Sequence, residues 1–201
     1  MAKIKYTKTE LKQQRDSLQR FQRYLPTLQL KKQQLQMEVR QLEIQIEEKA
    51  KEEETARTHL AGWIKLFAEP VPFEHYLSID RVQRTVNNIA GVNIPVLKRV
   101  AFSRSTPDLF ATDPWLDDAL DVLEHLTRLR LERLTIEEQH RLLAQELRVT
   151  TQRVNLFEKV KIPEARENIR VIRIFLGDQQ TAEVARAKMA KDRAMRKEAV
   201  S

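Results

Sequence analysis

The stretch that decides the fold runs from residue 122 to residue 157 and reads VLEHLTRLRLERLTIEEQHRLLAQELRVTTQRVNLF. It contains neither proline nor glycine, and apolar residues recur in it every three and four positions. Those predicted to form a heptad seam are Val122, Leu126, Leu129, Ile136, Leu143, Leu147, Val154 and Phe157. The polar members of the same series are Arg133, His140 and Thr150. Seven-residue spacing keeps one stripe of a helix facing a partner helix and imposes a left-handed supercoil.

The N-terminal part of the chain supplies a partner of comparable length, because a second heptad series runs through it. Its apolar members are Leu11, Leu18, Phe21, Leu25, Leu28, Leu35, Val39, Leu42 and Ile46. Three polar residues, Gln14, Lys32 and Lys49, interrupt the series. Because one chain carries both helices, they are predicted to pair as a hairpin. The expected fold is therefore mainly α-helical, a long antiparallel left-handed two-helix coiled coil with a small β-hairpin insert.

Breaks in the heptad pattern divide the chain into three segments. Residues 1–61 are predicted to form the N-terminal coiled-coil helix, with Thr9 as its N-cap. Residues 62–113 form a middle insert, and residues 114–201 form the long C-terminal coiled-coil helix with a basic tail. Proline inside a helix removes one backbone hydrogen bond and crowds the preceding turn. We therefore expect a bend or a brief 3₁₀ turn at Pro26 and a kink at Pro163.

Within the middle insert, β-branched and polar residues alternate between Ser78 and Phe102, which predicts a short β-hairpin over about residues 80–101. Its centre reads NNIAGVNIP, residues 87–95. The residues expected to shape it are Asn88, Ala90, Gly91, Val92 and Pro95. An isolated two-stranded hairpin is marginally stable in water. It must therefore pack against the helices or against a partner.

Composition narrows the class of protein. Charged residues make up 32% of the chain and glycine occurs only three times, which is typical of long helices. The net charge of +7 favours an acidic partner: nucleic acid, an anionic membrane surface or an acidic protein cavity. The absence of cysteine excludes disulfides and thiolate metal sites. No apolar run approaches the about 18 residues of a membrane span, so no membrane insertion and a cytoplasmic location are expected.

No catalytic constellation is recognisable in the sequence. A glycine-rich phosphate loop is missing, and His59, His75, His125 and His140 are too scattered to suggest a metal site. His140 occupies a seam position and is interpreted as a polar residue that sets the helix register. The aromatic residues expected to cover the end of the helical hairpin are Trp63, Phe67, Phe73 and Tyr76. We therefore predict a protein that is not an enzyme, with no cofactor and no metal.

Two motifs carry a family resemblance. The sequence RVNLFE at residues 153–158, followed by Ile162-Pro163 and by ENI at residues 167–169, resembles a motif of the D subunit of the V-type and A-type ATPases. The sequence NIAGVNIP at residues 88–95 resembles the hairpin of that family, and the N-terminal helix is similar to its bacterial branch. The motif residues are Arg153, Val154, Asn155, Glu158, Ile162 and Pro163.

The resemblance implies a central-stalk rotor shaft without an active site. Such a shaft transmits torque between the catalytic hexamer, which hydrolyses or synthesises ATP, and the ion-translocating ring in the membrane. The implied partners are the catalytic A and B subunits, the F subunit beside the shaft, and a socket-shaped C subunit that joins the shaft to the ring. The implied location is cytoplasmic and peripheral to the membrane, as part of the complex.

Basic residues near both chain ends are expected to meet the acidic-walled cavity of the catalytic head through many weak contacts. The candidates are Lys12, Arg15, Arg166, Arg170, Arg173, Lys188 and Arg193. Two other functions compete with the shaft. A helical-hairpin arm that binds nucleic acid would also be basic, but acidic residues are mixed along both helices. A prefoldin-like chaperone subunit would also join two long helices through β structure, but it would lack the motif at residues 153–163. Neither nucleic acid nor an unfolded client is therefore the expected partner.

Overall fold

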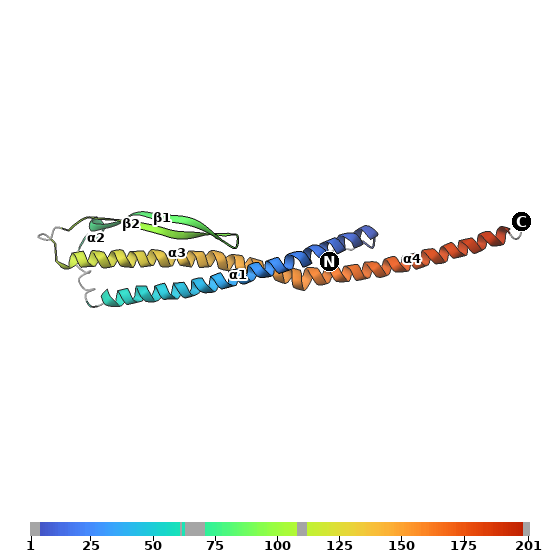
Figure 1. Cartoon of the computed structure of the whole chain (residues 1–201), viewed down its shortest axis with the longest axis horizontal. Coiled ribbons are helices and arrows are strands. Elements are labelled where there is room, and N and C mark those ends of the chain that lie inside the picture. The colour runs from blue at the N-terminus through green and yellow to red at the C-terminus, as the bar shows by residue number, and fades with distance from the viewer. Residues whose placement is uncertain (1–4, 61, 63–70, 108–111, 199–201) are drawn as a thin grey trace. The chain divides into compact units, whose positions relative to one another are not determined.

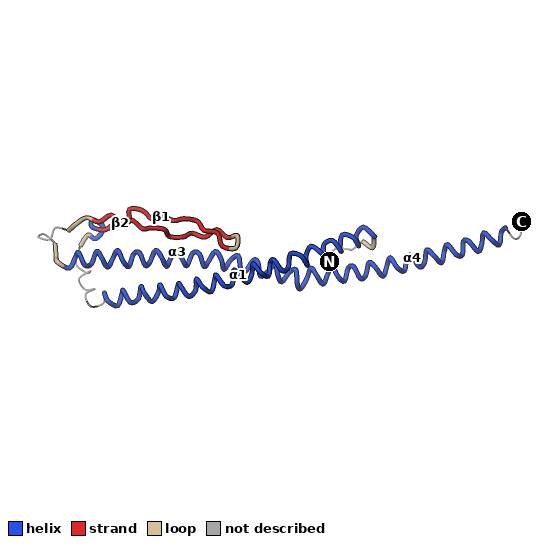
Figure 2. The backbone as a smooth tube through the Cα atoms, viewed as in Figure 1, coloured by secondary structure: helices blue, strands red, loops and turns tan. Residues whose placement is uncertain are grey.

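The computed structural model describes residues 5–60, 62, 71–107 and 112–198. Its elements, in chain order, are α1 (Lys8–Leu60), α2 (Phe73–Tyr76), β1 (Leu77–Ile89), β2 (Val92–Arg104), α3 (Trp115–Leu156), the π-helix η2 (Phe157–Lys161) and α4 (Ile162–Glu198) (Figure 1, Figure 2). The chain divides into two compact units. One unit, called the hairpin unit here, comprises residues 31–149. The other, called the terminal unit, comprises residues 1–30 and 150–201.

The hairpin unit pairs α1 with α3 in antiparallel fashion. Lys31 on α1 contacts Glu146 on α3, and Lys49 contacts Glu132, so residue numbers rise along one helix as they fall along the other. Its hydrophobic core is a cluster contributed by α1, α3 and β2, made up of Leu35, Val39, Leu42, Ile94 and Leu143. The expectation that the hairpin needs support from its surroundings is met here, because Ile94 of β2 is buried among helical side chains.

The β-hairpin is longer than the pattern predicts. β1 and β2 pair antiparallel from Leu77↔Arg104 to Ile89↔Val92, beyond the expected range of residues 80–101. The strands join through Ala90 and Gly91, whose φ angles of 50° and 81° are those of a two-residue type I′ turn. The pairing register shifts near Asp80 on β1 and near Lys98 on β2. These two bulges let the pairing continue although the alternation of side chains is interrupted.

The terminal unit pairs the first part of α1 with η2 and α4, again antiparallel. The ring centroids of Phe21 and Phe157 are 5.1 Å apart, and those of Tyr6 and Phe175 are 4.9 Å apart. The apolar residues buried along the second helical stretch are Val154, Ile162, Ala165, Ile169 and Ile172, and Thr150 is buried with them. Both chain ends therefore belong to this one unit.

One expectation about α1 is wrong, and one of the two alternatives expected at Pro26 is excluded. The helix begins at Lys8 and its N-cap is Thr7, not Thr9, since Glu10 donates its backbone N–H to Thr7 Oγ1 at 3.2 Å. Thr7 and Glu10 have the spacing of a capping box. At Pro26 the chain stays α-helical, so of the expected bend or brief 3₁₀ turn the 3₁₀ turn does not form. Pro26 is exposed, so water can hydrogen-bond the carbonyl that loses its N–H partner.

At Pro163 the expected disturbance takes the form of a π-helix. The turn Phe157–Lys161 precedes the proline, whose ring would clash with the carbonyl four residues earlier in an ideal α-helix. The π-helical turn holds one residue more than an α-helical turn, and the spacing of the inward-facing positions shows this extra residue. They step by three and four up to Phe157, by five to Ile162, and by three and four again to Ala165, Ile169 and Ile172. The heptad series of the sequence therefore stops at Phe157 because the helix itself shifts register there.

Candidate functional site

Four of the six polar residues that interrupt the heptads, Gln14, Lys49, Arg133 and His140, pair across the two helices. In the hairpin unit, Lys49 Nζ is 3.1 Å from Glu132 Oε2, and His140 Nε2 is 3.3 Å from Glu43 Oε1. In the terminal unit, Asn168 Nδ2 donates to Gln14 Oε1 at 3.4 Å. The pKa of Lys49 is raised above its ordinary value, mostly by its hydrogen bond to Glu52 and to a smaller extent by its hydrogen bond to Glu132. Each pair joins two defined positions on facing helices, so it favours one register over its neighbours.

A buried carboxylate anchors the most highly charged of these contacts. The side chain of Glu53 is 5% exposed and lies among three arginines. Arg57 is 2.7 Å away on the same helix, while Arg133 and Arg130 of α3 are 3.2 Å and 3.9 Å away. Glu53 Oε2 accepts no aligned hydrogen bond within the described chain, so its contact with Arg133 is a charge pair. Leaving this carboxylate without its guanidinium partners would be costly.

The hairpin is fastened to α3 at several points along its length. Gln139 Nε2 donates to the backbone oxygen of Pro95 at 2.6 Å, and the Arg128 guanidinium lies 5.8 Å from the centre of the Phe102 ring. At the open end of the hairpin, Arg104 pairs with both Asp117 and Asp121. Contacts at both ends hold the two-stranded ribbon along the helix.

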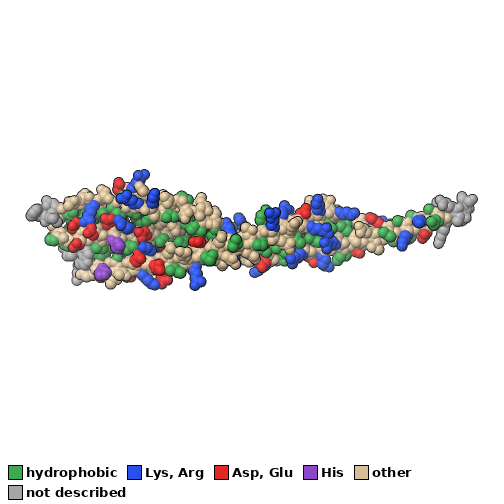
Figure 3. Space-filling view, viewed as in Figure 1, with side chains coloured by type: hydrophobic (Ala, Val, Ile, Leu, Met, Phe, Trp, Pro, Cys, Tyr) green, Lys and Arg blue, Asp and Glu red, His purple; other side chains and the backbone are tan. Residues whose placement is uncertain are grey.

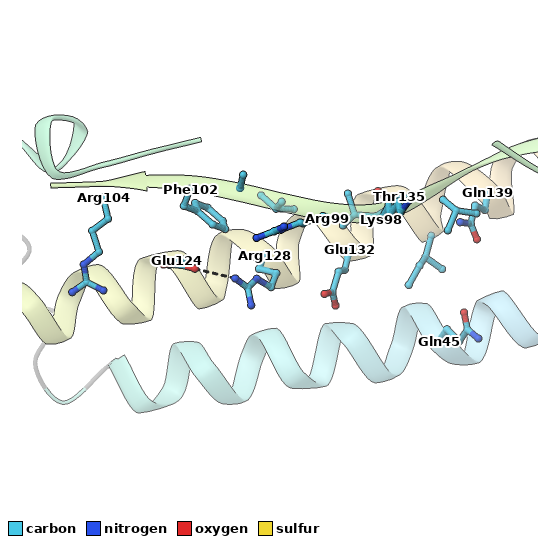
Figure 4. A pocket seen from close by; sticks show the side chains of 15 residues that line it. Gln45, Lys98, Arg99, Phe102, Arg104, Glu124, Arg128, Glu132, Thr135 and Gln139 are labelled. Atoms are coloured by element: carbon cyan, nitrogen blue, oxygen red, sulfur yellow. Dashed lines mark hydrogen bonds and ion pairs between the residues drawn. The ribbon is translucent and has the colours of Figure 1, made fainter. Parts of the chain in front are cut away.

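Between β2 and the helices lies a groove of about 750 Å³, shown in Figure 4. Its charged side chains are largely paired: Arg128 donates to Glu124 at 2.9 Å, and Glu132 meets Lys49. Thr135 and Gln139 hydrogen-bond to backbone oxygens. The side chains that line the groove therefore hold the hairpin against the helices. Among the described residues of the groove, no nucleophile is paired with a base, as a catalytic site would require.

The predicted hairpin residues gather at its tip. Ala90 and Val92 pack against the buried cluster of the hairpin unit. Asn88 Nδ2 donates to Asn93 Oδ1 at 2.7 Å, and Asn88 Oδ1 accepts the N–H of Gly91 at 3.1 Å. Pro95 lies farther along β2 and reaches Gln139 through its carbonyl. The tip is thus a closed polar network on a nonpolar base.

The structure places the other site candidates as follows. Among the seam residues, Leu35, Val39, Leu42, Leu129, Leu143 and Val154 are buried, and Leu18, Phe21, Leu25, Leu28, Ile46, Ile136, Leu147 and Phe157 are partly buried. In the family motif, Val154 and Ile162 are buried, whereas Arg153, Asn155, Glu158 and Pro163 are exposed. The candidate head contacts Lys12, Arg15, Arg166, Arg170, Arg173, Lys188 and Arg193 are all exposed. On the face shown in Figure 3, Lys and Arg are scattered over the terminal unit instead of forming one patch.

One feature of the hairpin unit has no clear signal in the sequence. A groove of about 890 Å³ lies between the C-terminal end of α1 and the first turns of α3. Ala56, Leu60 and Val122 give it apolar walls, and His59 and His125 line it from the two helices. These histidines are too far apart in sequence for any spacing rule to join them. Of the aromatic residues expected at this end, Trp63 and Phe67 lie outside the described residues, and Phe73 is 6.2 Å from Trp115, centre to centre.

Metal sites and membrane spans are both absent from the described ranges. No group of three or more His, Cys, Asp or Glu side chains there is arranged to hold a metal ion. None of the helices described combines the length and the apolar composition that a membrane span requires.

Comparison with known proteins assigns the family. The family described as the D subunit of ATP synthase matches residues 10–192. The D subunit of the V-type ATP synthase of Borreliella burgdorferi is 45% identical over 197 residues, which cover 98% of each chain. The protein of the same name from Chlamydia muridarum is 36% identical over 193 residues, covering 94% of this chain and 95% of its own. The chain therefore belongs to the family of ATP synthase D subunits, the non-catalytic central-stalk subunits of V-type rotary ATPases.

Proposed function

We propose that this chain is the rotor shaft that transmits torque between the catalytic hexamer and the membrane ion-translocating ring. The observation that carries the proposal is the family match over residues 10–192, which spans both units. Two long helices joined by regularly spaced contacts suit a part that must resist twisting. The two alternatives, a nucleic-acid-binding arm and a prefoldin-like chaperone, gain no support from the relatives.

The terminal unit is proposed to turn inside the head formed by the catalytic A and B subunits. From Gly177 to Met195 every residue is exposed except Ala182. This stretch carries exposed apolar residues, Val184, Met189 and Met195, together with many basic ones. Exposed ion pairs contribute only about 0–1 kcal/mol each and are screened by salt. Many shallow contacts of this kind would exchange readily during rotation, whereas one deep contact would lock the shaft.

The hairpin unit is proposed to meet the other partners. The F subunit would lie beside the β-hairpin, whose β1 strand is mostly exposed. The socket-shaped C subunit would receive the end where α1 finishes and α3 begins. The groove lined by Ala56, Leu60 and Val122 offers it an apolar surface there. The chain would stay in the cytoplasm, peripheral to the membrane, without inserting into the bilayer.

Removing the tail tests the shaft proposal. Reconstituted complexes would carry a chain that ends at Gly177, and ATP-driven rotation and coupled ion pumping would be measured. Loss of the exposed tail should weaken torque or assembly more than any single charge substitution does. A chain ending at Met189 is the intermediate control and should lose less. Full coupling after the longer deletion would contradict the proposed role of the tail.

A further inference from the structure

We infer that the free edge of β1 receives an acidic β-strand from a partner subunit, which pairs with the backbone of Arg84 and Val86. The inference deepens the proposed function and rests on it, because the probe below is the F subunit of the stalk. It follows from three features of the hairpin: the register of its strands, the covering of its other edge, and its unbalanced charge.

The register determines which backbone groups face outward. A two-residue hairpin turn closes on a hydrogen-bonded pair, here Ile89↔Val92. Pairs then alternate between hydrogen-bonded and non-hydrogen-bonded along an antiparallel ladder. Val86↔Pro95 and Arg84↔Leu97 are therefore non-hydrogen-bonded pairs, and their N–H and C=O groups point away from the partner strand. The carbonyl of Pro95 agrees with this assignment, since it accepts a hydrogen bond from outside the ladder, from Gln139.

The two edges of the ribbon differ in what covers them. The β2 edge faces α3, which satisfies the Pro95 carbonyl, and Pro95 has no N–H to expose. On β1, the N–H of Asn88 already donates to Asn87 Oδ1 at 2.8 Å. No described residue hydrogen-bonds the outward groups of Arg84 and Val86. Val86 is 72% exposed, more than any other large apolar side chain described. An open edge of this kind is a template for an added strand.

Charge selects the kind of strand. Five exposed basic residues lie on the two strands. Arg104 pairs with Asp117 and Asp121, whereas Arg81, Arg84, Lys98 and Arg99 make no ion pair within the described residues. Asp80 is the one carboxylate on the two strands. Figure 3 shows blue side chains gathered over the hairpin. A cross-strand carboxylate facing Arg84 would be stabilising, whereas a lysine there would be repelled. The fitting occupant is therefore a strand that carries acidic side chains.

The test uses the full chain and the purified F subunit, with hydrogen–deuterium exchange and titration calorimetry. On complex formation, the amides of Arg84 and Val86 should become protected by about tenfold or more. Val86→Pro removes the outward N–H without removing a β1–β2 hydrogen bond, and it should weaken binding about tenfold. Val86→Thr keeps the N–H and should bind within about twofold of the parent chain. Arg84→Glu should weaken binding at low salt, while Arg40→Glu, an equal charge change on exposed α1, should not.

The outcomes separate the two proposals. Failure of the parent chain to bind the F subunit would overturn the proposed partner and this inference together. Binding without protection of the Arg84 and Val86 amides would overturn the inference alone. An Arg84→Glu effect without a Val86→Pro effect would also overturn it, because a charged surface contact would then suffice. If circular dichroism shows that Val86→Pro does not fold, two other measurements decide whether the inference holds. They are the protection of the Arg84 and Val86 amides in the parent chain and the comparison of Arg84→Glu with Arg40→Glu.

Discussion

The two units of this chain use the same antiparallel helix pair but hold it together differently. In the hairpin unit, ion pairs join α1 and α3, with Lys31, Lys49 and Glu53 on one helix meeting charged partners on the other. In the described part of the terminal unit no ion pair crosses between the helices, which instead meet through buried apolar side chains, the Phe21–Phe157 ring pair and the Gln14–Asn168 amide pair. The basic candidate contacts of the terminal unit remain exposed.

The difference shows how one seam can serve two purposes. A repeating apolar stripe tolerates a slip of one heptad better than charge pairs do, because each misplaced charge loses its partner. The hairpin unit therefore fixes the register, and the hairpin seated on α3 reinforces it. The terminal unit relies on ring contacts and on the register shift at η2. That leaves its arginines and lysines free to face outward.

The largest effect is expected for Leu35→Ala in the hairpin unit. Leu35 is fully buried within a core built from α1, α3 and β2. The cavity left behind should lower the free energy of unfolding by about 3 kcal/mol. Leu18→Ala at a partly buried seam position of the terminal unit should cost about 1 kcal/mol, since less surface was removed from water. Urea unfolding followed by circular dichroism compares the two; equal losses would contradict the contrast between the units.

A smaller effect is expected at the Glu53 cluster. Arg133→Met should lower the free energy of unfolding by about 2 kcal/mol, because the buried carboxylate of Glu53 loses its partner on the facing helix. Arg57→Met is the matched control: Arg57 also contacts Glu53, but its side chain is 59% exposed, so its loss should cost about 0.5 kcal/mol. A double-mutant cycle between Glu53 and Arg133 should show coupling. Additive losses would mean that the pair does not fix the register.

Much of this architecture could be predicted from the sequence, and the errors have physical causes. The heptads indicated both helices because a buried stripe repeats over many turns, and the hairpin was visible in its alternating β-branched residues. Its ends were misplaced because bulges at Asp80 and Lys98 break that alternation. The partners of Lys49, Arg133 and His140 depended on the alignment of two helices far apart in sequence. The groove carrying His59 and His125 depended on the same alignment, so no local pattern could predict it.

In the terminal unit, the pair of Phe21 and Phe157 should couple weakly. Offset or tilted rings add about 0.5–1.5 kcal/mol beyond the area that they bury. Here the rings are tilted by 45° with centroids 5.1 Å apart. A cycle of Phe21→Leu and Phe157→Leu should give a coupling energy of about 1 kcal/mol. The pair Phe21 and Leu25, neighbours on α1 alone, provides the control cycle. A coupling near zero would show that Phe157 is held by the π-helix and not by its ring contact.

The smallest effect is expected for Arg170→Ala. Arg170 is exposed and pairs with Glu167 one turn earlier on α4, at 2.6 Å. The hydrogen bond and charge of Arg170 lower the pKa of Glu167 from its ordinary value of 4.5. Any contribution of the pair to the free energy of unfolding is therefore fully present above pH 4.5 and is lost only as the pH falls through the lowered pKa of Glu167. At neutral pH the pair is intact in the parent chain, but water and salt screen it, so its removal should leave the unfolding midpoint nearly unchanged.

The same substitution tests how the terminal unit meets its surroundings. If contacts with the catalytic head are many and shallow, removing one guanidinium should leave ATP-driven rotation and ion pumping close to those of the parent complex. Combining Arg166→Ala, Arg170→Ala and Arg173→Ala should reduce coupling progressively, and more at low salt than at high salt, because high salt already screens the charges that these substitutions remove. Rotation assays at two ionic strengths measure both effects. Complete loss of coupling on Arg170→Ala alone would show that the shaft depends on one specific contact with the head instead of many shallow ones.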